Sequence, residues 1–266
     1  MILERYRDEI IPNKRGREIE TIIVNAMLRQ SWCKQSLAQI EGATFAKYRD
    51  ERSRIVQPCT IRRELGILQH AFDVAVREWA LPLRNNPIKS IAKPTGSSRR
   101  SRRIQKGEFS RLICAAKQCR GKQMRGLILL GIETAMRQGE LLSAKWDHID
   151  IDKREWFIPF TKNGESRTIP LTRRSVRVLR ALQCTANDSA VFSLSSQAVK
   201  CAWRRILKRA EIADLHFHDL RHEAISHFFE LGLSVPEVSL ISGHKDARML
   251  FRYTHMTAKH VLAKLG

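Results

Sequence analysis

Four side chains that could act together on a phosphate group lie close to one another in the last third of the chain. His218 and Arg221 are three residues apart, His244 follows Gly243, and Tyr253 comes nine residues later. A tyrosine has a pKa of about 10, so roughly one molecule in a thousand is phenolate at pH 7. It becomes a competent nucleophile for phosphorus only where neighbours take its proton or stabilise the developing charge. Imidazole and guanidinium groups are neighbours of that kind.

One helix must position the first two of these residues. We expect it to run from about Asp219 to Leu231, with Leu220, Ala224, Phe228 and Leu231 on its buried face and Gly232 at its C-terminal end. His218 and Arg221 can then share a face at the helix start, where backbone N–H groups also favour an anion. The pattern predicts a phosphate pocket in outline.

The two segments that follow must bring His244 and Tyr253 to this pocket. Ser234-Val235-Pro236-Glu237 predicts a capping box that opens a short helix ending at Gly243, which leaves His244 at its mouth. Asp246 is the expected cap of the final segment, which carries Tyr253.

Two further cations precede these residues. Arg137 is expected at a join between two helices, where it could simply complement a helix dipole, and Glu140 could orient it by a hydrogen bond. Strands are predicted at 156–159 and 167–171, and the Asn-Gly pair between them indicates a hairpin. Lys162 falls at the hairpin tip, where it is either a solvated charge or an ammonium group delivered into a groove.

The charge of the chain indicates a polyanionic partner. Its 266 residues include 48 Lys and Arg against 27 Asp and Glu, and the formal net charge is +21. That excess is typical of proteins that bind nucleic acid, although a basic surface can also only confer solubility. No apolar run approaches the roughly 20 residues of a membrane span, and the N-terminus lacks the apolar stretch of a signal peptide. We therefore expect a cytoplasmic, nucleoid-associated protein with no membrane partner.

The chain divides into two predicted domains joined by a linker. Residues 1–88 indicate a small helical bundle, with one helix over 61–79 capped by Thr60, and its basic faces could meet DNA or be solvated. Residues 89–103 are rich in Pro, Gly, Ser and Arg, which predicts a basic linker that tracks a duplex or only connects the domains. Helices near 108–113, 124–133, 172–183 and 196–210 surround the hairpin in residues 104–266. The fold class is mainly α with a small antiparallel sheet.

Neither the cysteines nor the histidines form a metal pattern. The six cysteines (33, 59, 114, 119, 184 and 201) are scattered and are expected to fill the core. His222 and His227 resemble a metalloprotease helix, but they are five residues apart and the zinc motif needs four. No third ligand is evident beside His218 and His222. We predict no metal and no other cofactor.

Five motifs together resemble the tyrosine recombinase family, the phage-type integrases. They are Thr134 to Leu141, Lys162 in the hairpin, His218-Asp219-Leu220-Arg221-His222, Gly243-His244-Lys245 and Arg252-Tyr253-Thr254-His255, in the family's order and approximate spacing. The resemblance covers about 104–260 and implies a mixed α/β catalytic domain; the helices before it resemble the family's core-binding domain. Ala135 stands where glycine is common, which we expect to be neutral. The chain begins inside the core-binding domain, which puts arm-site binding in doubt.

The resemblance implies a role for each residue. Tyr253 would attack a DNA phosphodiester and form a 3′-phosphotyrosyl link, while Arg137 and Arg221 hold the non-bridging oxygens. His218 would accept the tyrosine proton, Lys162 would protonate the departing 5′-oxygen, His244 would donate to the phosphate, and Glu140 would support them.

This site-specific recombinase would act on double-stranded DNA as a homotetramer on two sites, with DNA-bending accessory proteins as possible partners. The alternatives are a catalytically silent DNA-binding relative and a type IB topoisomerase.

Overall fold

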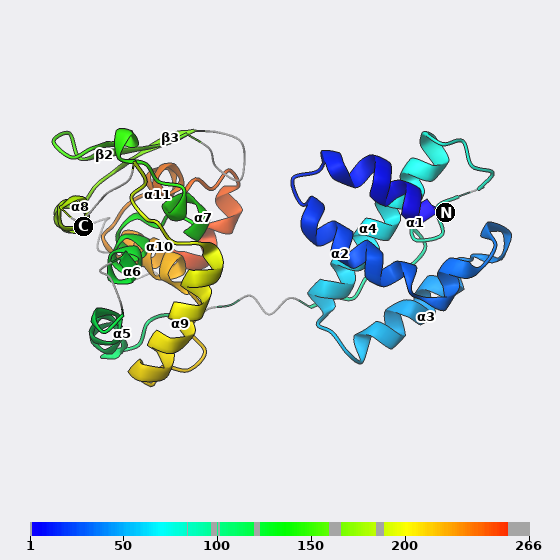
Figure 1. Cartoon of the computed structure of the whole chain (residues 1–266), viewed down its shortest axis with the longest axis horizontal. Helices are drawn as coiled ribbons and strands as arrows, with labels where there is room; N and C mark the ends of the chain where they lie inside the picture. The colour runs from blue at the N-terminus through cyan, green and yellow to red at the C-terminus, as the bar shows by residue number, and fades with distance from the viewer. Residues whose placement is uncertain are drawn as a thin grey trace, which may run out of the picture. The chain divides into compact units, whose positions relative to one another are not determined.

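A computed structural model describes residues 2–83, 85–96, 100, 102–119, 123–159, 166–184 and 189–254. The chain separates into two compact units, Met1–Arg99 and Arg100–Gly266, and each has its own hydrophobic core. Helices predominate, and one small antiparallel sheet lies in the second unit (Figure 1). The predicted fold class is confirmed. Among the described residues, no helix is long and apolar enough to cross a membrane.

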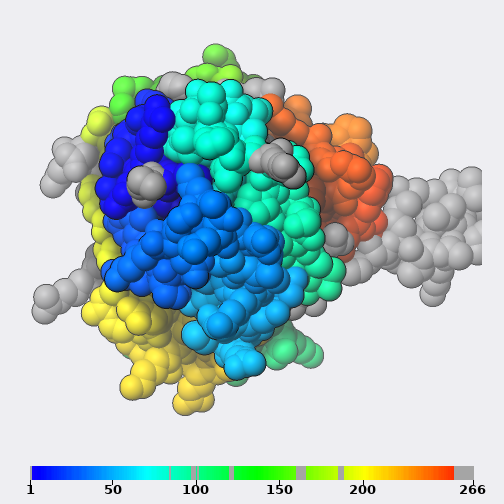
Figure 2. All heavy atoms as spheres, turned by 90° about the vertical axis from the view of Figure 1, so that its right-hand side faces the viewer, coloured from blue at the N-terminus to red at the C-terminus, as the bar shows by residue number. Residues whose placement is uncertain are grey.

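The first unit is built from helices and short helical turns. They are α1 (Ile2–Arg5), η1 (Tyr6–Ile10), η2 (Ile11–Asn13), α2 (Arg17–Leu28), η3 (Ser31–Lys34), η4 (Leu37–Gln39), α3 (Gly42–Ser53) and α4 (Pro58–Arg77). Figure 2 shows its surface, where the dark blue N-terminal residues lie beside the turquoise residues that follow α4. Phe45 is fully buried in this core, and its ring centroid lies 5.1 Å from that of Trp32 and 5.4 Å from that of Phe72.

One sequence expectation for this unit needs correction. Thr60 does not cap α4, because Pro58 occupies the first turn and the cap position falls on Gln57. In α2, Val24 and Met27 face the core, whereas Ile19 and Ile22 are 50% and 67% exposed.

The second unit combines helices with a three-stranded sheet. It contains α5 (Glu108–Lys117), α6 (Gln123–Thr134), α7 (Gln138–Leu142), η5 (Trp146–His148), β1 (Ile149–Asp150), β2 (Glu155–Ile158), β3 (Arg167–Pro170), α8 (Arg173–Gln183), α9 (Ser196–Ala210), α10 (Asp219–Glu230), α11 (Val235–Ser242), η6 (Ala247–Met249) and η7 (Phe251–Tyr253). The strands are antiparallel in the order β1-β2-β3. The predicted pair of strands is therefore present, and the turn that carries Lys162 lies outside the described residues.

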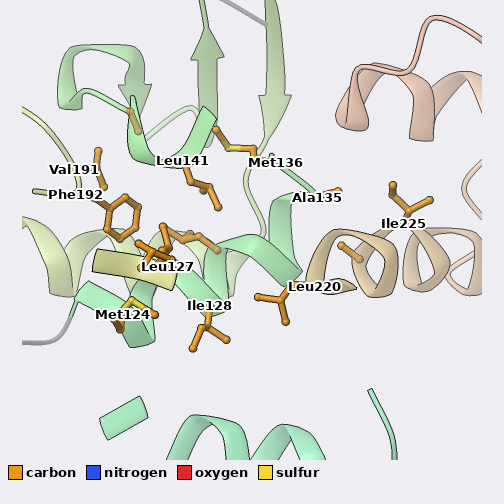
Figure 3. Packing of buried hydrophobic residues seen from close by; sticks show 14 of the residues in the cluster. Met124, Leu127, Ile128, Ala135, Met136, Leu141, Val191, Phe192, Leu220 and Ile225 are labelled. Carbon is orange, nitrogen blue, oxygen red and sulfur yellow. The ribbon is translucent and has the colours of Figure 1, made fainter. Parts of the chain in front are cut away.

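Helix α6 runs through the core of the second unit and packs against α8 and α10 (Figure 1). Leu127 and Ile128 of α6 lie in one cluster with Leu141 of α7 and Leu220 of α10 (Figure 3). This packing fixes the end of α6 and the start of α10, which are the two places where the sequence predicts guanidinium groups.

Two expectations for buried side chains are wrong. Leu231 is 63% exposed because α10 ends at Glu230 and Leu231 is its C-cap. Cys59, Cys114 and Cys184 are also exposed, so these three thiols do not fill a core.

Candidate active site

A tight turn after α6 places Arg137 at the start of α7. Ala135 adopts a left-handed conformation with φ of 51°, which costs an L-residue with a Cβ about 1–2 kcal/mol and is free of that cost for glycine. Arg137 is therefore the N-cap of α7, not a cation at the end of α6. Its backbone N–H donates to Glu140 Oε2 over 2.9 Å, and its Nη1 donates to Oε1 over 2.8 Å.

A second arginine, Arg167 at the start of β3, binds the same carboxylate. Its Nη2 donates to Glu140 Oε2 over 2.8 Å and its Nε to the carbonyl of Ile241 over 3.1 Å. Sequence reasoning treated Arg167 only as a strand residue. The sequence did contain a signal for a buried Arg167. Arg167, Ile169 and Leu171 alternate along the strand, and this alternation places all three on the buried face of the sheet.

Glu140 stays ionised between these arginines. Burial by itself would raise the pKa of its carboxyl, but hydrogen bonds from Arg167 and Arg137 lower that pKa to about 2. One carboxylate thus faces two guanidinium groups, and the cluster keeps a net positive charge.

Arg221 lies on the first turn of α10 and is 3% exposed. Its Nη1 donates to the carbonyl of Ala135 over 2.5 Å and its Nη2 to the carbonyl of Ser242 over 2.6 Å. Burial lowers the pKa of Arg221, and the charge of Arg137 lowers it further. A guanidinium nevertheless keeps its proton in proteins, so an anion at this place would be strongly favoured.

His244 follows α11, which begins at the predicted capping box and ends at Gly243 with φ of 68°. Its Nδ1 is 2.7 Å from the hydroxyl oxygen of Ser242. Burial lowers the pKa of His244 to about 4, with further lowering by the charges of Arg221 and Arg137. The imidazole is therefore neutral at pH 7. If the Ser242 hydroxyl donates to Nδ1, the ring proton is on Nε2, where it can be donated to a ligand.

Tyr253, at the end of η7, is 7% exposed and packed between two side chains. Its ring is stacked on the imidazole of His222, with centroids 5.6 Å apart, and the guanidinium carbon of Arg252 lies 5.1 Å from its centroid. The hydroxyl is hydrogen-bonded to His222 Nδ1. Burial raises the pKa of Tyr253, while the charges of Arg252 and Arg221 oppose that shift.

His222 therefore occupies a position that the sequence analysis did not assign to it. The sequence places it at the end of the motif that begins at His218, directly after Arg221, but the resemblance gives it no role in the reaction. Its ring meets that of His218 edge-on, with centroids 4.8 Å apart. In the described part of the chain, no group of three or more His, Cys, Asp or Glu side chains could hold a metal ion.

Arginines from the predicted linker hold α10 in place. Arg100 Nη2 pairs with Asp219 over 2.9 Å, and Arg103 Nη2 pairs with Glu223 over 2.7 Å. The carbonyl of Arg100 also accepts a hydrogen bond from Arg252, beside Tyr253. Arg100 and Arg103 thus contact the helix of Arg221, and Arg100 also contacts the turn of Tyr253. Tracking a duplex with these arginines would require them to exchange carboxylates for phosphates.

The structure brings together most of the predicted site residues. Arg137, Glu140, Arg221 and His244 are linked by hydrogen bonds or by the influence of their charges, and Tyr253 joins them through Arg221. His218 reaches the cluster through His222. Lys162 lies outside the described residues, so its position in the site stays a prediction.

Residues 102–260 match the model of the phage integrase family. The chain belongs to this family, and it is a tyrosine recombinase. It is similar to a shufflon-specific DNA recombinase of Escherichia coli, with 39% identity over 99% of this chain and 70% of the relative. It is also similar to a putative integrase/recombinase of Haemophilus influenzae, with 30% identity over 94% of this chain and 83% of the relative. The family expected from the motifs is confirmed.

The fold of this tyrosine recombinase has been seen before. The integrase of the Tn1549 transposon, solved with circular intermediate DNA, aligns with a TM-score of 0.82 at 13% identity and covers 100% of this chain and 99% of that one. A lambda integrase tetramer bound to a Holliday junction aligns with a TM-score of 0.81 at 19% identity, over 95% of this chain and 76% of that one. These two likenesses concern the fold.

Proposed function

We propose that this tyrosine recombinase cuts and rejoins double-stranded DNA at specific sites through a covalent 3′-phosphotyrosyl link to Tyr253. The observation that carries the proposal is the burial of the Tyr253 phenol within range of the charge of Arg221, which also acts on His244 and is influenced by Arg137. A cluster with excess positive charge can bind the anionic phosphodiester of DNA, and a phenol at the edge of that cluster can attack the bound phosphorus.

In the proposed step the Tyr253 Oη–P bond forms and the P–O5′ bond breaks. The phenolic proton passes to the imidazole of His218, and the 5′-oxygen takes a proton from Lys162. Attack by a 5′-hydroxyl reverses the step and rejoins a strand, so the phosphodiester energy is conserved in the tyrosyl link.

Arg137 and Arg221 would stabilise the charge that builds on the phosphoryl oxygens. Carbonyl oxygens orient Arg221, and Glu140 orients Arg137, so neither guanidinium needs to reorganise when the phosphate binds. His244 would add one hydrogen bond through Nε2. Losing one donor of this kind typically slows a reaction by about 10²–10³.

Four copies on two duplexes would allow the strands to be exchanged in pairs. The resemblance to a lambda integrase that forms a tetramer on a Holliday junction supports this assembly. The apolar residues Val261, Leu262 and Leu265, which the sequence suggests for docking between copies, lie outside the described residues. Native mass spectrometry with and without DNA would measure the number of copies.

The decisive test compares the parent chain with Tyr253→Phe on nicked duplex fragments from the DNA that flanks its gene. We expect the parent to give a covalent protein–DNA adduct on a denaturing gel and Tyr253→Phe to give none. Tyr48→Phe is the matched control, because it removes a buried phenolic hydroxyl from the first unit, and it should still give the adduct.

Other outcomes would indicate the alternative functions. Binding of these fragments without any adduct would indicate a catalytically silent relative. Relaxation of any supercoiled plasmid regardless of sequence would indicate a topoisomerase.

A further inference from the structure

The proposed nucleophile, Tyr253, contacts His222, a residue to which the family motifs give no role in the reaction. Tyr253 Oη is hydrogen-bonded to His222 Nδ1, and the two rings are inclined by only 29°. We propose that His222 positions the phenol of Tyr253 and accepts its proton as the Oη–P bond forms. This inference rests on the proposed function and replaces His218 as the acceptor.

The direction of the hydrogen bond follows from the two groups. His222 is neutral at pH 7, because burial and the charges of His218, Arg252 and Arg221 lower its pKa to about 4 against the opposing effect of Asp219. Tyr253 keeps its proton, because burial raises the pKa of the phenol. The phenol therefore donates to Nδ1, and the imidazole carries its own proton on Nε2.

Without DNA the proton stays on the tyrosine. Burial raises the pKa of the phenol and lowers the pKa of the imidazole to about 4, and both shifts disfavour transfer. A phosphodiester bound at Arg137 and Arg221 places negative charge near His222, which raises the imidazole pKa. Bond formation to phosphorus makes the phenol more acidic at the same moment. The nucleophile is thus activated only when its substrate is in place.

The atoms balance in this step. The Oη–H bond breaks and Nδ1 takes the proton; the Oη–P bond forms and the 5′-oxygen leaves with a proton from the general acid. In the reverse step the His222 imidazolium returns its proton to the phenolic oxygen. His218, whose ring meets His222 edge-on with centroids 4.8 Å apart, is then a positioning residue for His222.

The hydrogen bond between Tyr253 and His222 can be tested without DNA. In the intact chain, ¹⁵N NMR of the imidazoles should show His222 with an unprotonated Nδ1 that accepts a hydrogen bond, and Tyr253→Phe should shift that signal. A proton on Nδ1, or a signal unchanged in Tyr253→Phe, would overturn the positioning role. This NMR experiment needs no variant of His222, so its result does not depend on whether such a variant folds.

The proton transfer is tested by His222→Asn, whose side-chain oxygen can accept the phenol's hydrogen bond but cannot take its proton. His218→Asn is the matched control on the neighbouring imidazole. The substrate is a nicked duplex with a 5′-bridging phosphorothiolate at the mapped cleavage position, because a thiolate leaves without being protonated. We expect His222→Asn to form adduct about 10²–10⁴ times more slowly than the parent, with a rate that rises with pH. The rate of adduct formation should fall less in His218→Asn.

Each result decides between the two hypotheses. Adduct formation by His222→Asn at the parent rate, or a larger loss in His218→Asn than in His222→Asn, would overturn His222 as the acceptor and leave the proposed function intact. Failure of the parent chain to form any adduct on the flanking fragments would overturn the proposed function and, with it, the proton transfer. The NMR result would still decide the positioning role.

Discussion

At the scale of single residues, the site depends on one carboxylate. Glu140 is 6% exposed and accepts hydrogen bonds from Arg137 and Arg167, so its charge is what allows two guanidinium groups to lie side by side. Removing that charge leaves two partly buried cations without a counter-charge, which costs more than losing the hydrogen bonds themselves.

Glu140→Gln should therefore destabilise the protein strongly. Breaking a buried ion pair by removing one partner costs about 3–5 kcal/mol, and we expect a value in that range for the free energy of unfolding in urea. Glu133→Gln is the control, since Glu133 pairs with the 44% exposed side chain of Arg174, and surface pairs contribute about 1 kcal/mol or less. Equal losses of unfolding free energy in the two variants would show that the ion pairs of Glu140 contribute no more than a surface ion pair.

Single residues also show how far the sequence could predict the site. Motif spacing predicted Arg137, Glu140, Arg221, His244 and Tyr253 as site residues, and the structure brings these five together. The partners of Arg221 could not be predicted in this way. They are backbone carbonyls of Ala135 and Ser242, which lie 86 and 21 residues away in sequence and meet it only through the packing of α6, α10 and α11.

At the scale of elements, the ends of helices do the positioning. Arg137 caps α7, Arg221 lies in the first turn of α10, and His244 follows the glycine that ends α11. Local sequence signals predict such ends well, because a capping box or a terminal glycine acts through neighbouring residues. Thr60 shows where they fail, since the proline two residues before it set the start of α4.

Gly243 makes this positioning testable. With φ of 68° it has the left-handed backbone that ends α11, and a Cβ there would lie 2.9 Å from Arg167 Nη1. Gly243→Ala should lower the free energy of unfolding by more than the roughly 1–2 kcal/mol of backbone strain, because Arg167 must also move from its place beside Glu140. Urea unfolding and adduct formation would measure the two effects.

Gly232 provides the matched control for that substitution. It ends α10 with φ of 87°, and nothing lies within 4 Å of a Cβ built there. Gly232→Ala should show the backbone strain alone and form adduct at the parent rate. If both variants lost the same stability and both kept the parent rate, the contact between Gly243 and Arg167 would have no part in the site.

At the scale of the whole molecule, charge governs the encounter with DNA and the site governs the chemistry. Roughly two thirds of the net charge of +21 belongs to the second unit, which also contains the candidate active site. Part of that charge is engaged within the protein, as in the pairs of Arg100 and Arg103 with acidic residues of α10. Binding of the phosphate backbone must draw on the remaining cations or displace these pairs.

We therefore expect binding and cleavage to be separable in the full chain. Affinity for a duplex of random sequence should fall linearly with the logarithm of salt concentration, by about 10³–10⁵ between 50 and 200 mM if six to ten phosphates are contacted. Tyr253→Phe removes no charge, so its affinity and salt slope, measured by fluorescence anisotropy, should equal those of the parent while its adduct is lost. A tenfold weaker affinity in Tyr253→Phe would instead attribute the missing adduct to binding. An affinity independent of salt would mean that the excess charge has some partner other than the DNA backbone.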